Sequence, residues 1–217
     1  MAFQLAGNSN VVADVGGTTF RALKTTAVPV DYGSLGIYRK SLLSGTMAAG
    51  LAANSEVFQF RWTDATRVCV IQSVQLDGLS GSATAFAAGF GKIDLVPARA
   101  WTADGSGGTA ATLTGNNAKM RTSMSTSLGP SIRIASTAAL TAGTKTLDTD
   151  PVGQLSLSFG TAVSVQYANT VNLIDEAAHE MPLVLSTQEG FVIRATVPAT
   201  GTWQFGVTVL WAELNSY

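Results

Sequence analysis

The feature that most constrains the fold is a stretch near the end of the sequence, residues 183–214, in which apolar and polar side chains alternate. Apolar residues occupy every second position of 191–197 and again of 203–211. A period of two over this length predicts half-buried β-strands. The segments 188–190 and 198–201 are short and end on glycine, which favours tight turns. We therefore expect three consecutive strands that pair as an antiparallel meander.

The same alternation predicts which side chains form the hydrophobic core. The predicted core residues are Phe191, Ile193, Trp203, Phe205, Val207 and Val209. The four tryptophans are interpreted as core or interface anchors, while a sugar-stacking role for one of them stays open. They are Trp62, Trp101, Trp203 and Trp211.

Earlier segments repeat the strand pattern over shorter lengths. Strands are expected at 37–43, 56–62, 67–76 and 92–101, the last interrupted by Pro97, and Asp77-Gly78 is expected to end the third with a turn. Residues 154–167 have room for one or two short strands, residues 140–151 are interpreted as a loop, and residues 171–179 are faintly helical. Many short strands with almost no amphipathic helix predict an all-β fold, an antiparallel β-sandwich of jelly-roll type.

The first 32 residues differ from the rest. They alternate short apolar pieces with Gly, Asn, Thr and Pro and show no helical period. We expect an extended N-terminal arm or outer strand over residues 1–32, followed by a sandwich domain over residues 33–217. Such an arm could add a strand to the sheet edge of an adjacent subunit. The first residues lack the pattern of a signal peptide, and no apolar run reaches the length of a membrane span.

The surface of this chain must be built mostly from small, uncharged residues. Charged residues make up 12% of the chain, the net charge is −1, and hydrophobic residues make up 46%. Such a surface suits a protein that is covered by neighbours. The basic residues Arg39, Lys40 and Arg61 are scattered and form no stripe, so the sequence predicts no nucleic-acid interface.

One short motif resembles a nucleotide site. The segment Asp14-Val15-Gly16-Gly17-Thr18-Thr19-Phe20-Arg21 is similar to the first phosphate-binding turn of the sugar-kinase and actin-like ATPase superfamily. In that superfamily the glycines let backbone N–H groups approach the phosphates. The likeness covers about eight residues, and the further acidic and glycine-rich motifs of the superfamily are not found. We interpret the segment as a Gly-Gly turn between short strands.

Three other groups of residues are weighed as sites and rejected. The segment 175–180 brings Asp175 and three further acidic or histidine residues together, but one histidine without a second cluster indicates a solvated loop or helix cap. The glycine-rich segment 105–109 lacks the Lys of a P-loop and is expected to be a flexible loop. Cys69 is the only cysteine and lies in an apolar run, which predicts a buried, inert thiol. We therefore predict no catalytic, cofactor-binding or metal site, and no enzyme.

Four blocks of sequence carry a more extensive resemblance. They are DYGSLG at 31–36 with Tyr38-Arg39, AANSE at 52–56 with FRWT at 60–63, LTGNN at 113–117, and EGFVIRATV at 189–197. These blocks resemble a family of tailed-bacteriophage and prophage virion proteins, over most of the chain after residue 30. The resemblance implies a structural protein of the virion, made in the bacterial cytoplasm.

Within the virion, the leading expectation is a capsid decoration or cement protein. Its partners would be the major capsid protein or other virion proteins, and it would form a homo-oligomer, with a trimer favoured. No nucleic acid, membrane or cofactor is expected. Two alternatives stay open: another virion component, such as a tail or head-fibre base protein, and a carbohydrate-binding or enzymatic β-sandwich.

Overall fold

The chain consists of two separate units, Met1–Val30 and Asp31–Tyr217. The computed structural model describes residues 3–4, 12–13, 36–48, 50–81, 84–159, 166–175, 181–215 and 217. In the first unit, β1 (Phe3–Gln4) pairs antiparallel with β2 (Val12–Ala13). The rest of the predicted arm, including the segment 14–21, lies outside the described residues.

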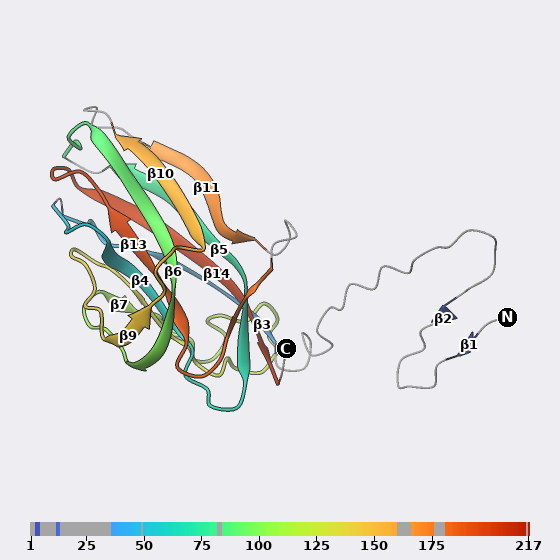
Figure 1. The fold of residues 1–217 in the computed structure, drawn as a ribbon. Coiled ribbons are helices and arrows are strands. Elements are labelled where there is room, and N and C mark those ends of the chain that lie inside the picture. The colour runs from blue at the N-terminus through green and yellow to red at the C-terminus, as the bar shows by residue number, and fades with distance from the viewer. Residues whose placement is uncertain are drawn as a thin grey trace. The chain divides into compact units, whose positions relative to one another are not determined.

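The second unit is built from two antiparallel sheets (Figure 1). The smaller sheet has the order β11-β5-β14-β3, and β12 also pairs with β5. Its strands are β3 (Ile37–Leu43), β5 (Val68–Gly81), β11 (Gln166–Asp175), β12 (Leu183–Leu185) and β14 (Trp203–Leu214). The larger sheet has the order β10-β6-β13-β4-β8-β7, and β9 also pairs with β6. Its strands are β4 (Ser55–Arg61), β6 (Gly89–Ala103), β7 (Thr109–Ala110), β8 (Ser131–Ile134), β9 (Thr144–Leu147), β10 (Gly153–Phe159) and β13 (Gly190–Thr196).

The eight main strands follow the order of a jelly roll. These strands are β3, β4, β5, β6, β10, β11, β13 and β14. The chain changes sheet at each step from β3 to β6, again between β10 and β11, then between β12 and β13, and between β13 and β14. This arrangement confirms the predicted all-β, jelly-roll-like sandwich. A long insertion, residues 104–152, separates β6 from β10 and contributes β7, β8 and β9. The insertion carries most of the polar contacts considered below.

The predicted C-terminal meander is wrong. Its strands exist, but β13 pairs with β4 and β6 in the larger sheet, whereas β14 pairs with β3 and β5 in the smaller one. The turn at 198–201 therefore joins two strands that face each other across the core. A short glycine turn and alternating side chains fit both arrangements, because neither encodes which backbone groups a strand will bind.

Two local interruptions predicted in the strands are wrong. Asp77-Gly78 is a β-bulge, not a turn: Phe205 of β14 lies opposite Leu79 and Val207 opposite Leu76, so β5 continues to its end. Pro97 does not interrupt β6 either, since the strand continues to Ala103. The carbonyls of Leu95 and Pro97 accept bonds from Val152 and Asp148, so the proline's missing N–H faces away from β13.

Two segments that the sequence predicted as loop or helix are strands in the structure. Residues 144–147, predicted as loop, form β9 against β6. Residues 171–175, predicted as faintly helical, belong to β11. In both cases a neighbouring strand offers backbone hydrogen bonds that override a weak local preference.

The core lies between the two sheets, as predicted. All six predicted core side chains are buried, at most 2% exposed. The ring of Phe60 in the larger sheet contacts the ring of Trp211 in the smaller sheet edge-on, with 5.6 Å between the ring centres. Trp203 stacks on Phe205 with 5.2 Å between the ring centres. The four tryptophans are buried too. Among the described residues there is no helix with the length and hydropathy that a membrane span requires.

Candidate functional site

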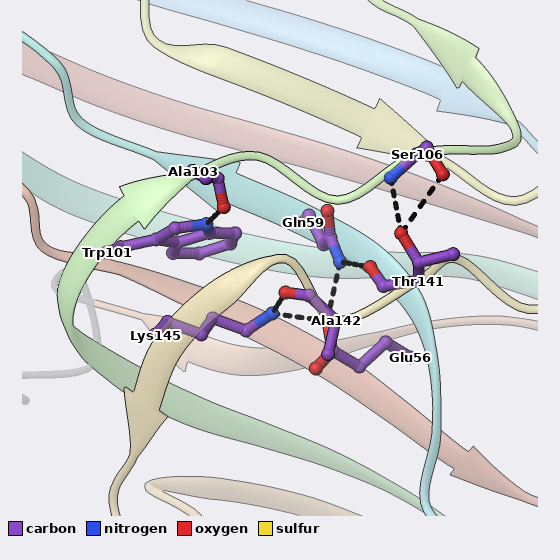
Figure 2. Close-up of polar contacts among 8 residues, drawn as sticks. All are labelled: Glu56, Gln59, Trp101, Ala103, Ser106, Thr141, Ala142 and Lys145. Carbon is purple, nitrogen blue, oxygen red and sulfur yellow. Dashed lines mark hydrogen bonds and ion pairs between the residues drawn. The ribbon is translucent and has the colours of Figure 1, made fainter.

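The most connected group of buried polar side chains lies where the insertion meets the larger sheet (Figure 2). Lys145, at the start of β9, places its Nζ 2.8 Å from Oε2 of Glu56 on β4. The two side chains are only 2% and 8% exposed. The Lys145 ammonium also donates to the carbonyl of Ala142 and lies 4.4 Å from the centre of the Trp101 ring. The charge is therefore bound by a carboxylate, a carbonyl and an aromatic face.

Gln59 joins this ion pair to a second part of the insertion. Its Nε2 donates to Glu56 Oε2 at 2.6 Å and to the carbonyl of Thr141 at 2.8 Å. The hydroxyl of Thr141 in turn accepts a bond from the backbone N–H of Ser106 at 2.6 Å. Gly105 is required here, because an added Cβ would lie 2.0 Å from the Thr141 carbonyl oxygen. We name Glu56, Gln59, Trp101 and Lys145 the insertion anchor.

A β-bulge brings Glu56 and Gln59 together. Opposite β13, Ile193 pairs with Phe58 and Arg194 with Glu56, so Val57 is an extra residue in β4. Without the bulge, residues three apart in a strand would point to opposite faces. With it, both side chains bind the same insertion. Sequence alternation alone could not have found this pair.

The chemistry of the insertion anchor is that of a structural contact. Both charges are buried, paired and hydrogen-bonded, which is the arrangement that makes a buried ion pair tolerable. The Gln59 carbonyl oxygen is buried and has no hydrogen-bond partner in the part of the chain that the structure describes. The anchor therefore fastens residues 104–147 to the sheet.

A second buried carboxylate, Glu213 at the end of β14, fastens another part of the insertion. Its oxygens accept bonds from the Ser127 hydroxyl at 2.6 Å, the Leu128 N–H at 2.9 Å and the Trp211 indole N–H at 3.1 Å. Burial raises the pKa of Glu213 above its ordinary value, although these three donors oppose the shift. Burial, with the Glu213 charge adding to it, also raises the pKa of Tyr38 to about 12. The Tyr38 hydroxyl donates to the Ser125 carbonyl.

The raised pKa of Glu213 predicts a pH dependence of stability. A carboxyl that binds its proton more tightly when folded contributes stability below its unfolded pKa and loses it as pH rises through the folded pKa. We expect the free energy of unfolding of the wild type, relative to Glu213→Gln, to fall as pH rises from the ordinary glutamate value of 4.5. Urea unfolding from about pH 4 to about pH 8 measures this difference. A difference that rises with pH would contradict it.

The two segments that the sequence analysis considered as possible sites, 175–180 and 105–109, do not come together in the described part of the structure. Asp175 ends β11, where its Oδ2 accepts a bond from Asn172 Nδ2 at 2.6 Å, and residues 176–180 lie outside the described part. Gly105 and Ser106 lie beside the insertion anchor, in a loop as predicted. Within the described ranges, no three His, Cys, Asp or Glu side chains lie close enough to hold a metal ion.

The predicted burial of Cys69 and of the tryptophans is confirmed. Cys69 is a free, buried thiol, and burial, followed by the charge of Glu213, raises its pKa well above the ordinary value, so little reactive thiolate forms. Trp101 and Trp203 are at most 1% exposed, so neither ring is a platform for sugar stacking. Trp101 instead covers Lys145 and donates its indole N–H to the Ala103 carbonyl at 3.0 Å.

Sequence reasoning missed the charged residues that matter most here, Glu56, Lys145 and Glu213. The available signal was a charge inside an apolar strand, as in Trp211-Ala212-Glu213-Leu214. Such a residue is rarely buried without a partner. Comparison with models of known protein families gives no match, and no characterised protein matches this sequence.

Proposed function

We propose that this protein is a structural component of a tailed-phage virion, a decoration or cement protein that binds the outer head shell and stabilises it. The sequence blocks that resemble phage virion proteins support this role. Two of them are adjacent in the fold: Phe60 of β4 pairs with Phe191 of β13, and their rings stack at 5.2 Å. The likeness therefore includes the centre of the larger sheet.

The observation that carries the proposal is an exposed phenylalanine on one face of the larger sheet. Phe90, at the start of β6, is 87% exposed. Ser158 lies directly opposite it on β10, and Lys92 pairs with Ser156 two positions further on. Both serines and Gln154 are exposed. We name these five residues the Phe90 face.

The Phe90 face has the features of a protein contact. An exposed aromatic side chain with serines, a glutamine and one lysine around it is the pattern of an interface anchor with a polar rim, and the Lys92 charge is paired with Asp94 at 2.6 Å. In a shell, many symmetry-related copies make the same contact, so weak single contacts add up. The partner in this proposal is the major capsid protein.

Particles that lack the protein provide the direct test. We expect these particles to disrupt at a lower temperature than complete particles when heated. When salt is removed, we expect them to disrupt while the salt concentration is still higher. Adding the purified protein should restore stability in both tests. Equal stability with and without it would refute the cement role. Electron microscopy separates a decoration protein from another virion component, because a decoration protein must occupy icosahedrally repeated positions.

A point substitution tests the Phe90 face itself. We expect Phe90→Ser to leave the melting temperature unchanged and to weaken binding to particles by at least about 2 kcal/mol, as for an interface anchor. Met120→Ser is the matched control, since Met120 is also exposed, at 57%, but lies in the insertion. Binding of Phe90→Ser that equals that of the wild type would show that another surface makes the contact.

A further inference from the structure

The edge of the smaller sheet has a short open stretch. β3 is the last strand of that sheet, and among the described strands it pairs with β14. Ser44 donates its N–H to the Phe205 carbonyl and Gly36 accepts a bond from Glu213, so the even-numbered residues of β3 face β14. The odd-numbered residues direct their backbone groups outward.

Both ends of this outer edge are closed within the chain. Arg39 donates its N–H to the Ala118 carbonyl at 2.9 Å, and Gly45 donates to the Ala135 carbonyl at 3.3 Å. Between them, no backbone hydrogen bond from the described residues reaches the outward N–H and C=O groups of Ser41 and Leu43. Ser41 is exposed, and Leu43 is 69% exposed. We name these outward groups the β3 slot.

The β3 slot is an accessible template for one added strand. Unpaired N–H and C=O groups on a sheet edge readily bind another extended segment. The slot is only long enough to pair about two residues directly, because the contacts at Arg39 and Gly45 limit it. An apolar residue in the added strand would cover Leu43.

The charged side chains nearest the ends of the β3 slot are cations, although the Asp77 carboxylate lies nearby, bound to the Thr208 hydroxyl that also contacts Ser41. Arg39 is exposed and has no carboxylate partner among the described residues, and Lys40 donates only to the Thr112 carbonyl, at 3.2 Å. Lys119 lies next to the same edge through its bridge with Tyr38. An added strand with one acidic residue would therefore complement the edge.

One segment of the chain has a short strand and a single acidic residue, as the length of the β3 slot and the cations around it require. Asp14 is the only charged residue among the first twenty, and it lies in the apolar segment Val11-Val12-Ala13-Asp14-Val15. Val12–Ala13 is β2, whose partner among the described residues is the two-residue strand β1. A two-stranded sheet of this size is marginal in water and gains from a third strand. Residues 14–35, at about 3.3 Å each, can span about 70 Å when extended, enough to reach a neighbouring molecule.

We propose that the β3 slot binds residues 11–15 of a second copy of this chain as an added strand, with Asp14 beside Arg39. The choice of a second copy rests on the proposed function, in which many copies lie side by side. Each copy would then both donate and accept a strand, linking neighbours through main-chain hydrogen bonds. Because the contact is heterologous, it suits a closed ring such as a trimer.

Hydrogen exchange of the full-length protein tests the proposal without phage particles. We expect the amides of Ser41 and Leu43 to exchange more than about tenfold more slowly as protein concentration is raised. The amide of Leu42, which faces β14, is the internal control and should not change. Fast exchange at every concentration would overturn the proposal. Slow exchange that is independent of concentration would mean that the slot is filled from the same chain, and would also overturn it.

Charge reversal identifies the donor segment. Arg39→Asp and Asp14→Arg should each weaken self-association by roughly two- to fivefold, the size of an exposed ion pair. Mixing the two variants should restore association, because the reversed segment of one then meets the reversed edge of the other. No weakening by either variant, or no restoration on mixing, would reject residues 11–15 as the donor. The particle tests above depend on neither result, so the two proposals can fail separately.

Discussion

We expect the substitution Phe205→Asp to leave the second unit unfolded. Phe205 is 2% exposed, between the sheets, and stacks on Trp203. Removing a core phenylalanine costs about 3 to 5 kcal/mol, and an unpaired buried carboxylate adds several more. Together these losses match or exceed the stability of most domains, about 5 to 15 kcal/mol. Circular dichroism should show loss of the native β-sheet signal, and binding to particles should disappear with it.

The matched control is the same substitution at an exposed phenylalanine. Phe90→Asp places a carboxylate at a position that is 87% exposed, so the charge stays hydrated. We expect its free energy of unfolding to lie within about 0.5 kcal/mol of the wild type. A folded Phe205→Asp protein would show that the inward face of β14 is wrongly assigned.

The second large effect is expected at the insertion anchor. Lys145→Met removes the cation and leaves the buried Glu56 carboxylate with Gln59 as its remaining side-chain partner. Breaking a buried ion pair from one side typically costs about 3 to 5 kcal/mol. We expect a loss of this size in the free energy of unfolding, measured by urea denaturation near neutral pH. Hydrogen exchange should increase most in residues 139–147, which the anchor holds.

Two further variants show whether the buried charge is the cause. Arg99→Met breaks two partly exposed pairs, with Glu189 at 2.8 Å and with Asp148 at 3.3 Å, and should cost at most about 1 kcal/mol for each pair. The double variant Glu56→Leu with Lys145→Met removes both charges and should be more stable than Lys145→Met alone. If the double variant is the less stable of the two, an unpaired Glu56 charge does not explain the loss.

The strands were largely predictable because their side-chain pattern is local. The strand predicted at residues 37–43 has the same bounds as β3. The six core residues predicted in β13 and β14 are buried. The pairing of those two strands was not predictable. Their glycine turn marks where the chain reverses, but it does not encode whether the two strands pair or face each other across the core.

The polar anchors were the least predictable part of the structure. Glu56 and Gln59 act together only because of the bulge at Val57, and Lys145 approaches them from a segment that looks like a loop in the sequence. Glu213 is satisfied by the Ser127–Leu128 segment, some 85 residues away in the chain. Each of these contacts needs the insertion to be folded back on the sheet.

The sequence by itself determined that this chain forms β-strands around an aromatic core, with a weakly charged surface and an inert cysteine. These properties follow from side-chain period and composition, which act locally or on average. Only the tertiary structure decided which strands pair, which charges are buried, and where the sheet edge at Ser41 and Leu43 remains open. Backbone hydrogen bonds are the same for every residue except proline, so their partners are chosen by the packing of the whole fold.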